Sequence, residues 1–330
     1  MLSRVAESLY WMARYIERAE DLTRLLAVNF NALLDTHSAE DALQGWHPLV
    51  NITGDEDLFT ASYPHTNAES VIDFLLWHPL NHNAVTACIN RARENARSVR
   101  EQISSEMWEQ INKLYFLVRD TSRSTVLANP SEFFQEVRNG SQAFQGITSA
   151  TLMHGEPYHF IHLGMFLERA DKTARILDAK YLSLNTLPRE SAETSLQLIA
   201  LLRSCSAFEP FRRSAKGELD IEHVAYYLLL DHDFPRAVLF CLDASLKALD
   251  ILGSTNAESL KITHPRRTLG RISADLEYLD INEILGDKMD PYLNQLLVRL
   301  NAAGDDIARA YFNTRVILPD SRPQQQQQQQ

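Results

Sequence analysis

Acidic and basic residues occur at helical spacing in two short stretches of the sequence. The first, YIERAEDLTR, occupies positions 15–24, and the second, FLERADKTAR, occupies positions 166–175. In the first stretch Glu17, Glu20 and Arg24 lie three, four and seven residues apart, so a helix places them on one face. Such a group can supply a general base with an arginine that orients a carboxylate substrate, or an ion-pair network between helices.

The second stretch repeats this arrangement 151 positions later, with Glu168, Asp171 and Arg175 on one face. Arg18 and Arg169 each follow the first acid of their stretch. They point further round the helix, where we expect them to reach a neighbouring helix or a ligand. Each stretch therefore predicts a helix with a charged stripe and an additional arginine beside it.

An apolar stripe accompanies each charged stripe. Apolar or small residues recur every three or four positions, which is typical of an amphipathic helix that packs against other helices. The centre of the charged group lies about 100° from the centre of the apolar stripe, so we expect the charges to be partly buried. The apolar stripes comprise Val5, Leu9, Met12, Ile16, Ala19, Thr23 and Leu26, and Phe160, Leu163, Leu167, Ala170, Ala174 and Leu177.

Two interpretations of the charged stripes are open. In the structural interpretation, the acids and arginines form a helix-to-helix ion-pair network that fixes the register of two matching helices. In the functional interpretation, they form a polar site that holds a charged ligand or a side chain of a partner. Spacing alone favours the structural interpretation, because carboxylate–arginine pairs are common and carry little chemical specificity.

The repeat extends beyond the charged stretches. FLLWHPLNHNAVTACI, at 74–89, aligns without a gap with YLLLDHDFPRAVLFCL, at 227–242, at an offset of 153. The order matches that of the charged stretches and the offset changes by only two residues, which indicates an internal duplication. We therefore predict an all-α fold: a large helical bundle built from two pseudo-repeated halves, each starting with a Glu-Arg helix.

The predicted domain covers residues 1–318, with halves at about 1–150 and 151–318. A disordered Gln-rich tail is expected at 319–330, because a polar run of one residue type cannot build a core. No sustained strand alternation occurs. Loops are expected near 37–66, 129–140, 184–190, 212–219, 253–266 and 286–290.

Composition narrows the classes of function. The formal net charge of −11 argues against nucleic acid or an anionic membrane as the main partner. No sequence window predicts a membrane span, and three cysteines without a CxxC pair fit a reduced, cytoplasmic protein. The eleven histidines form no metal-ligand pattern, and no P-loop or dinucleotide fingerprint occurs, so we predict no metal and no cofactor.

An arginine-rich helix predicted at 88–103 adds further charged candidates. Arg93, Glu94 and Arg97 lie on its charged side. The default interpretation is a solvated basic face paired with acids, and the alternative is a face that binds a phosphate or a carboxylate. Interleaved aromatic residues are absent, which argues against single-stranded nucleic acid.

Several stretches resemble the bacterial alpha-E family, an all-helical domain named for its Glu-Arg motif. They are RVAESLYWMARYIERAEDLTRLL, ARENARSVREQISSEMWEQIN, GMFLERADKTAR, FPRAVLFCL and LGRISADLEYL, in order over about residues 1–315. Ala13-Arg14 stands where the family usually has Gly-Arg, which implies a slightly wider helix contact. In the second copy, Gly164-Met165 keeps the glycine and loses the arginine.

The resemblance implies partners more than a reaction. Family members occur beside, or fused to, circularly permuted ATP-grasp proteins, often with transglutaminase-like proteins. ATP-grasp enzymes join a carboxylate to an amine through an acyl-phosphate, so the resemblance implies a peptide- or amino-acid-modifying system. The family's motif makes Glu17–Arg18 and Glu168–Arg169 the first candidate functional pairs, followed by Arg93, Glu94, Arg97 and Arg236.

Three hypotheses follow. The first, which we favour, is a non-catalytic or co-catalytic helical partner of an ATP-grasp amide ligase. The second is a stand-alone enzyme in which Glu17 or Glu168 is a general base and an arginine orients a carboxylate substrate. The third is a purely structural helical scaffold. The sequence leaves open whether the protein forms a homo-oligomer and whether the two Glu-Arg helices touch.

Overall fold

The computed structural model describes residues 1–34, 45–188, 191–214, 218–254 and 259–312. Within these ranges every regular element is a helix and no strand occurs, so the all-α prediction is confirmed. The α-helices are α1 (Ser3–Leu34), α3 (His47–Thr53), α4 (Glu56–Ser62), α5 (Ala68–Trp77), α6 (Val85–Ser98), α7 (Ser105–Asp120), α8 (Arg123–Ala128), α9 (Pro130–Thr151), α10 (Glu156–Thr186), α11 (Ala192–Ser204), α12 (Phe208–Ser214), α13 (Ile221–Leu230), α14 (Val238–Ser254), α15 (Ser259–Glu277) and α16 (Met289–Ile307).

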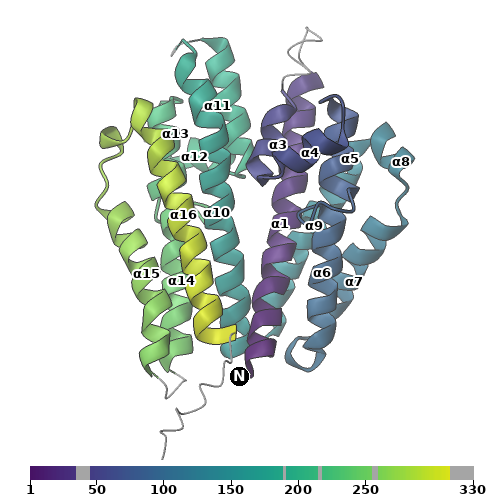
Figure 1. The fold of residues 1–330 in the computed structure, drawn as a ribbon, viewed down its shortest axis with the longest axis vertical. Helices are drawn as coiled ribbons and strands as arrows, with labels where there is room; N and C mark the ends of the chain where they lie inside the picture. The colour runs from purple at the N-terminus through teal and green to yellow at the C-terminus, as the bar shows by residue number, and fades with distance from the viewer. Residues whose placement is uncertain (35–44, 189–190, 215–217, 255–258, 313–330) are drawn as a thin grey trace, which may run out of the picture.

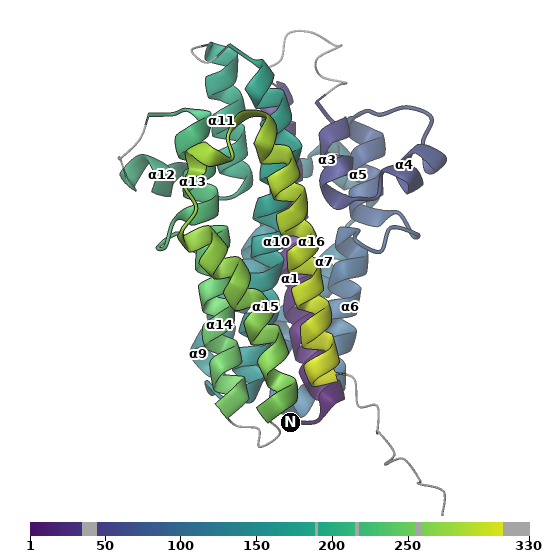
Figure 2. The same ribbon diagram turned by 60° about the vertical axis from the view of Figure 1, so that its left-hand side comes forward.

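Helices α1 and α10, which carry the two Glu-Arg stretches, lie side by side along the centre of the bundle (Figures 1 and 2). They approach closely at Gly164 of α10. A Cβ atom built there would lie 2.3 Å from the backbone oxygen of Tyr10 in α1, a distance that no real side chain adopts. Glycine is therefore required at this crossing, because only a hydrogen atom fits between the two backbones.

Each central helix has its own set of packing partners. Helix α1 packs against α6 and α9, and α7 packs on both of these. Helix α10 packs against α14 and α16, and α15 packs on both of these. In Figure 1 the first set lies to the right and the second to the left. The predicted apolar stripes face these contacts: Leu9, Ile16, Leu163 and Ala174 are buried, while Val5 at the end of its stripe is only partly buried.

Two capped turns hold polar residues beside the central helices. Before α6, Asn81 donates from Nδ2 to a backbone oxygen of α5 at 3.1 Å and accepts from the N–H of Asn83 at 2.8 Å. Before α14, Asp231 accepts from backbone N–H groups two and three residues ahead, at 2.9 and 2.7 Å. These local bonds mimic a backbone turn. They fix the positions of Asn83 and Arg236, which both reach the central helices.

Four stretches expected to be loops are largely helical in their described parts. One of them, 286–290, consists of a 3₁₀ turn at Gly286–Lys288 and the start of α16. Helix α9 covers most of 129–140, helices α3 and α4 lie within 37–66, and α15 covers most of the described part of 253–266. Pro130 stands at the first position of α9, where a missing N–H costs no hydrogen bond, so this proline starts a helix. Pro265 lies inside α15, where a proline is unfavourable in isolation and tertiary packing overrides the local preference.

Other expectations concern the ends and the redox state of the chain. The tail predicted at 319–330, and the end of the predicted domain after residue 312, lie outside the described residues. Cys88, Cys205 and Cys241 are buried and unpaired. None of the described helices combines the length and apolar character that crossing a membrane requires.

Candidate functional site

The two Glu-Arg motifs bind each other across the α1–α10 contact. Arg169 of α10 donates from Nε to Glu17 Oε1 of α1 at 2.9 Å. Arg18 of α1 donates from Nε to Glu168 Oε1 of α10 at 2.6 Å, and from Nη2 to Oε2 at 3.1 Å. Both glutamates are fully buried. The arginine of each motif therefore binds the glutamate of the other, and the two helices are cross-linked reciprocally.

Around Glu17 the structure gathers a larger group, which we call the first-helix cluster. Arg236, from the turn before α14, donates from Nη1 to Glu17 Oε1 at 2.7 Å and from Nη2 to Glu20 Oε2 at 2.7 Å. It also reaches Asp21 Oδ1 at 3.0 Å. Arg24 donates to Glu20 Oε2 at 2.5 Å and to Asp21. The cluster comprises Glu17, Glu20, Asp21, Arg24, Arg169 and Arg236.

Burial in the first-helix cluster separates the pKa values of its acids. Burial alone would raise the pKa of Glu20, but Arg236 and Arg24 reverse this and lower it to about 2. Burial raises the pKa of Asp21 to about 7, against the lowering effect of Arg24 and Arg236. Asp21 Oδ2 is buried and has no hydrogen-bond partner among the described residues, which fits a carboxyl that readily holds a proton.

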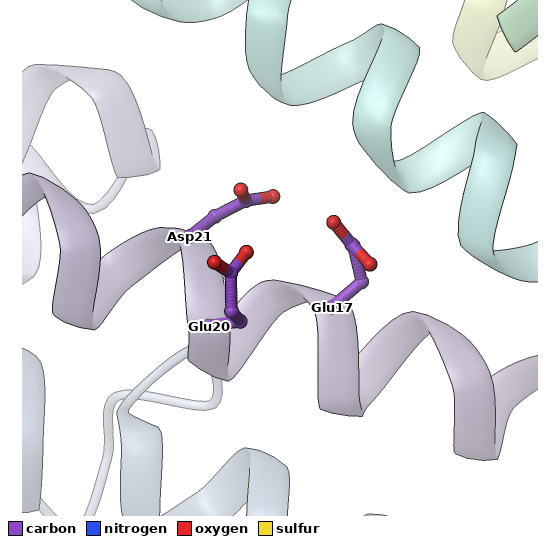
Figure 3. Close-up of side chains that lie close together, drawn as sticks. All are labelled: Glu17, Glu20 and Asp21. Atoms are coloured by element: carbon purple, nitrogen blue, oxygen red, sulfur yellow. The ribbon is translucent and has the colours of Figure 1, made fainter. Parts of the chain in front are cut away.

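The carboxylates of this cluster have the spacing of metal ligands. Glu17, Glu20 and Asp21 lie on adjacent turns and the same side of α1 (Figure 3), and one oxygen of each lies within 4.8 Å of the others. Three arginines already bind these oxygens, so the site offers ligands without the net negative charge that favours a hard cation. The arrangement is an ion-pair network first, and we assign no metal to it.

A second-helix cluster surrounds Glu168. Arg14 donates from Nε to Glu168 Oε2 at 2.6 Å, and Lys172 Nζ lies 3.8 Å from Glu168 Oε1. Lys172 Nζ also lies 3.3 Å from Asp171 Oδ2, which accepts from Arg175 Nε at 2.9 Å. Burial would raise the pKa of Glu168, but Arg18 and Arg14 hold it well below the usual value. The cluster comprises Glu168, Asp171, Lys172, Arg175, Arg14 and Arg18.

Polar residues outside the two stretches complete the clusters. Gln145 of α9 donates from Nε2 to Glu17 Oε2 and accepts from Arg169 Nη2, both at 2.7 Å. Arg18 Nη1 donates to Asn83 Oδ1 at 2.7 Å. Each cross-pair is thus held by an amide from a neighbouring element, which fixes the rotamers of both members.

The structure brings together most of the predicted site residues. Glu17, Glu20, Arg24, Arg169 and Arg236 meet in the first-helix cluster, and Arg18, Glu168, Asp171 and Arg175 meet in the second. These residues are more deeply buried than the helical wheel predicted, because α9 and the turn before α14 cover the stripe that α10 leaves open.

The arginine-rich helix α6 lies apart from both clusters. Arg93 donates to Asn112 Oδ1 of α7 at 2.8 Å and lies 4.3 Å from the ring centroid of Tyr115. Glu94 and Arg97 pair with each other at 2.6 Å on an exposed face. This arrangement favours the default interpretation, a solvated face paired with acids.

Sequence reasoning missed several members of the clusters. Asp21 and Lys172 lie inside the two charged stretches, and their opposite charges at aligned positions were a signal that could have been read. For Arg14 the signal was the family resemblance, in which Ala13-Arg14 stands where a Gly-Arg pair is usual. Gln145 and Asn83 carried no signal, because an amide on another helix contacts these stretches only after folding.

Two hollows border α1. The α1–α9–α10 cavity has a volume of about 260 Å³. The α1–α6 groove is larger, about 730 Å³. The cavity is lined by charged, amide and apolar groups that include Glu17, Gln145, Arg169, His162, Ile16 and Met165. The groove is lined by aromatic and charged groups that include Trp11, Tyr15, Arg4, Arg91, Glu7 and Glu94.

Comparison with known proteins finds relatives without an assigned activity. Uncharacterized proteins of Mycobacterium bovis and of two strains of Mycobacterium tuberculosis are 25% identical over 342 aligned positions. The alignment covers 96% of this chain, and the chain spans only 37% of the length of these relatives. No solved structure matches.

A family model matches residues 1–312 and is described as a predicted alpha-helical domain with a conserved ER motif. The two places where Glu is followed by Arg in this chain are the two halves of the reciprocal cross-link, Glu17–Arg18 and Glu168–Arg169. The match covers nearly the whole described chain and includes both motifs, so the protein belongs to the Alpha-E family.

Proposed function

We propose that the chain is a non-catalytic helical partner of an ATP-grasp amide ligase, and that it docks on that protein through the α1–α6 groove. The observation that carries this proposal is a contrast along α1. Glu17 and Arg18 of α1 are already bound in ion pairs inside the bundle. Trp11 and Tyr15 of the same helix, in contrast, stay partly exposed in the groove.

The chemistry of the groove supports a protein partner. The rings of Trp11 and Tyr15 stack with centroids 5.5 Å apart, and the guanidinium of Arg91 lies 5.7 Å from the Tyr15 ring. Tryptophan, tyrosine and arginine are the residues that most often dominate binding energy at protein interfaces. Arg4 and Glu7 at the margin supply charges of both signs for a polar rim.

The ion pairs that occupy the two Glu-Arg motifs argue against a catalytic role for these residues. Glu17 and Glu168 each bind at least two cationic or amide groups and are fully buried, so neither is positioned to take a proton from a substrate. We propose that the motifs hold α1 and α10 in register, and that this rigid pair presents the groove to the partner.

The length of the relatives supports a role alongside other domains. In the mycobacterial proteins the matching segment is 37% of the polypeptide, so there the domain is joined to further sequence. We propose that the partner here is the circularly permuted ATP-grasp protein implied by the family resemblance, in a cytoplasmic pathway that modifies peptides or amino acids. A transglutaminase-like protein is a further member of that pathway.

We also propose that the molecule descends from a duplicated half. The packing of α1 with α6 and α9 parallels that of α10 with α14 and α16, and this supports the repeat seen in the sequence. The duplication explains why two clusters use the same acid–acid–base spacing. Trp11 and Tyr15 align with His162 and Phe166, whose rings also contact each other, with centroids 5.6 Å apart.

The docking proposal is tested by co-expression with the ATP-grasp protein of the same genome. We expect the two proteins to co-purify, and amide formation over a panel of amino acids and short peptides to require both. Trp11→Ala combined with Arg91→Glu should weaken binding by about a hundredfold, because both side chains line the groove and are of the types that dominate interface energy. Tyr278→Ala is the matched control, since this tyrosine is 87% exposed and lies outside the groove. Failure of the wild-type proteins to bind, or equal binding by the groove variant, would refute the proposal.

A further inference from the structure

The α1–α9–α10 cavity has the size of a site for a small molecule. Its volume is about 260 Å³, and a water molecule takes about 30 Å³ of liquid, so the cavity holds roughly nine such volumes. That is smaller than most pockets for drug-sized ligands. A molecule of roughly nine non-hydrogen atoms, the size of a medium amino acid, would fill it.

One side of the cavity is a buried polar surface. Arg169 is 8% exposed and lines the cavity with Glu17 and Gln145. The guanidinium donates to Glu17, to Gln145 and, at 3.5 Å, to the Pro235 backbone oxygen. A guanidinium has five N–H groups, so two remain without a partner among the described residues. Gln145 likewise uses one of its two amide hydrogens, for Glu17. The polar side therefore offers more donors than acceptors.

The electrostatics of the adjoining cluster favour an anion. The first-helix cluster has three acids and three arginines, and Asp21 titrates near neutral pH, so the cluster carries a partial positive charge there. His162, which also lines the cavity, contributes no charge, because burial lowers its pKa to about 4. A carboxylate beside Arg169 would gain a charge-assisted hydrogen bond.

The other walls of the cavity are apolar. Ile16 comes from α1, Phe144 from α9, and Ile161 and Met165 from α10. Ile16, Phe144 and Ile161 are almost fully buried, so they form a preformed surface that would bury an aliphatic group. A ligand that fits both sides has a carboxylate at one end and a short branched chain at the other.

We propose that this cavity binds a small aliphatic carboxylate of amino-acid size, with the carboxylate on Arg169 and Gln145 and the apolar group against Ile16, Ile161 and Met165. This site goes beyond the docking role. The cavity and the α1–α6 groove share no lining residue, so the ligand-binding proposal can be tested independently of the docking proposal.

A larger side chain at position 146 can block the cavity, and this tests the site. Gly146 of α9 lines the cavity, and a Cβ atom built there meets no atom within 4 Å. A side chain can therefore be added without a clash with the backbone. Gly146→Leu extends four carbon atoms from the lining, whereas Gly146→Ala makes the same gain in helix propensity and leaves the cavity open. The alanine variant is the matched control.

The experiment is a titration of the full chain by calorimetry with four probes: isovalerate, L-leucine, isovaleramide and L-leucinamide. We expect both acids to bind at least about tenfold more tightly than their amides, because only the acids offer a charged acceptor to Arg169. Gly146→Leu should lose binding of the acids, and Gly146→Ala should keep it. Thermal melting of both variants checks that they fold.

Three results would overturn the proposal. Binding of none of the probes at about 10 mM would exclude a ligand of this class, since even millimolar affinity would then be detected. Equal affinity for acids and amides would exclude a role for Arg169 as carboxylate anchor. Undiminished binding by a folded Gly146→Leu protein would place the ligand elsewhere.

Discussion

The first-helix and second-helix clusters share one acid–acid–base pattern and differ in how they balance charge. In the first, three acids meet three arginines, and the arginine side chains are 4–9% exposed. In the second, two acids meet four bases, whose side chains are 12–27% exposed. A balanced set can be buried completely, whereas excess positive charge must stay near water. The aligned positions Asp21 and Lys172 account for most of this difference.

The difference shows how one motif that occurs twice in the chain can form two kinds of ion-pair network. In the first-helix cluster Arg24 binds two acids and Arg236 binds three, so the network is redundant, and it borders a cavity. In the second-helix cluster one acid, Glu168, forms the ion pairs with both Arg14 and Arg18 and is approached by Lys172. The second-helix cluster thus depends on one residue for the α1–α10 contact, and the predictions below test that dependence.

The largest expected effect is that of Glu168→Gln. Removing this charge leaves Arg14 and Arg18 largely buried without their acid, and we expect a loss of about 3–5 kcal/mol in the free energy of unfolding. Glu17→Gln should cost about 1–3 kcal/mol, because Arg236 still binds Glu20 and Asp21. Calorimetric melting of the two variants measures the difference.

Equal melting temperatures for the two glutamine variants would contradict the proposed asymmetry. Partner binding by the same variants then separates structure from function. Variants that melt lower and still bind the ATP-grasp protein would show that the motif is architectural. Variants that fold normally and lose the partner would show that the motif belongs to the interface.

A smaller effect is expected at the α1–α10 crossing. Gly164→Ala places a Cβ atom against the Tyr10 backbone oxygen and must push the helices apart, at a cost of about 1–3 kcal/mol. Gly146→Ala has open space around its Cβ and should stabilise the protein by about 1 kcal/mol. The two glycine variants make a matched pair for thermal denaturation. If Gly164→Ala melts no lower than the wild type, the crossing is looser than the structure indicates.

The last expected effect is a pH dependence of stability that comes from the first-helix cluster. Burial raises the pKa of Asp21 from 3.8 to about 7, so between these values the folded state binds more protons than the unfolded state. The stability from this group is full below about pH 4 and is lost as the pH rises to about 7, with a slope of at most about 1.4 kcal/mol per pH unit. Asp21→Asn lacks this titration.

The measurement is the melting temperature of the wild type minus that of Asp21→Asn between pH 4 and 8. We expect this difference to fall as the pH rises. His162, whose pKa is lowered to about 4, gives the opposite slope, but it is present in both proteins and cancels in the difference. A flat difference would mean that Asp21 is ionised throughout. A lysine stands at the aligned position 172, so the second-helix cluster has no counterpart of the Asp21 carboxyl.

The sequence predicted which helices carry the clusters better than it predicted how deeply the cluster residues are buried. Apolar periodicity identified α1 and α10, and the helical wheel placed Glu17 and Glu168 beside the packing face. The wheel could not show that these residues are fully buried, because it describes one helix and burial depends on the others. The loop expected at 129–140 is part of α9, and this error concealed the helix that carries Gln145.

The sequence alone determined the all-helical class, the two amphipathic helices and nine of the twelve cluster residues. Periodicity and helix propensity act over a few residues, so they can be read locally. Only the tertiary structure decided that Arg18 binds Glu168, that Arg169 binds Glu17, and that Arg236 arrives from a turn 219 residues from Glu17. These pairings follow from the close crossing at Gly164 and from the packing around it. Both depend on residues that are distant in the chain and adjacent only in the folded state.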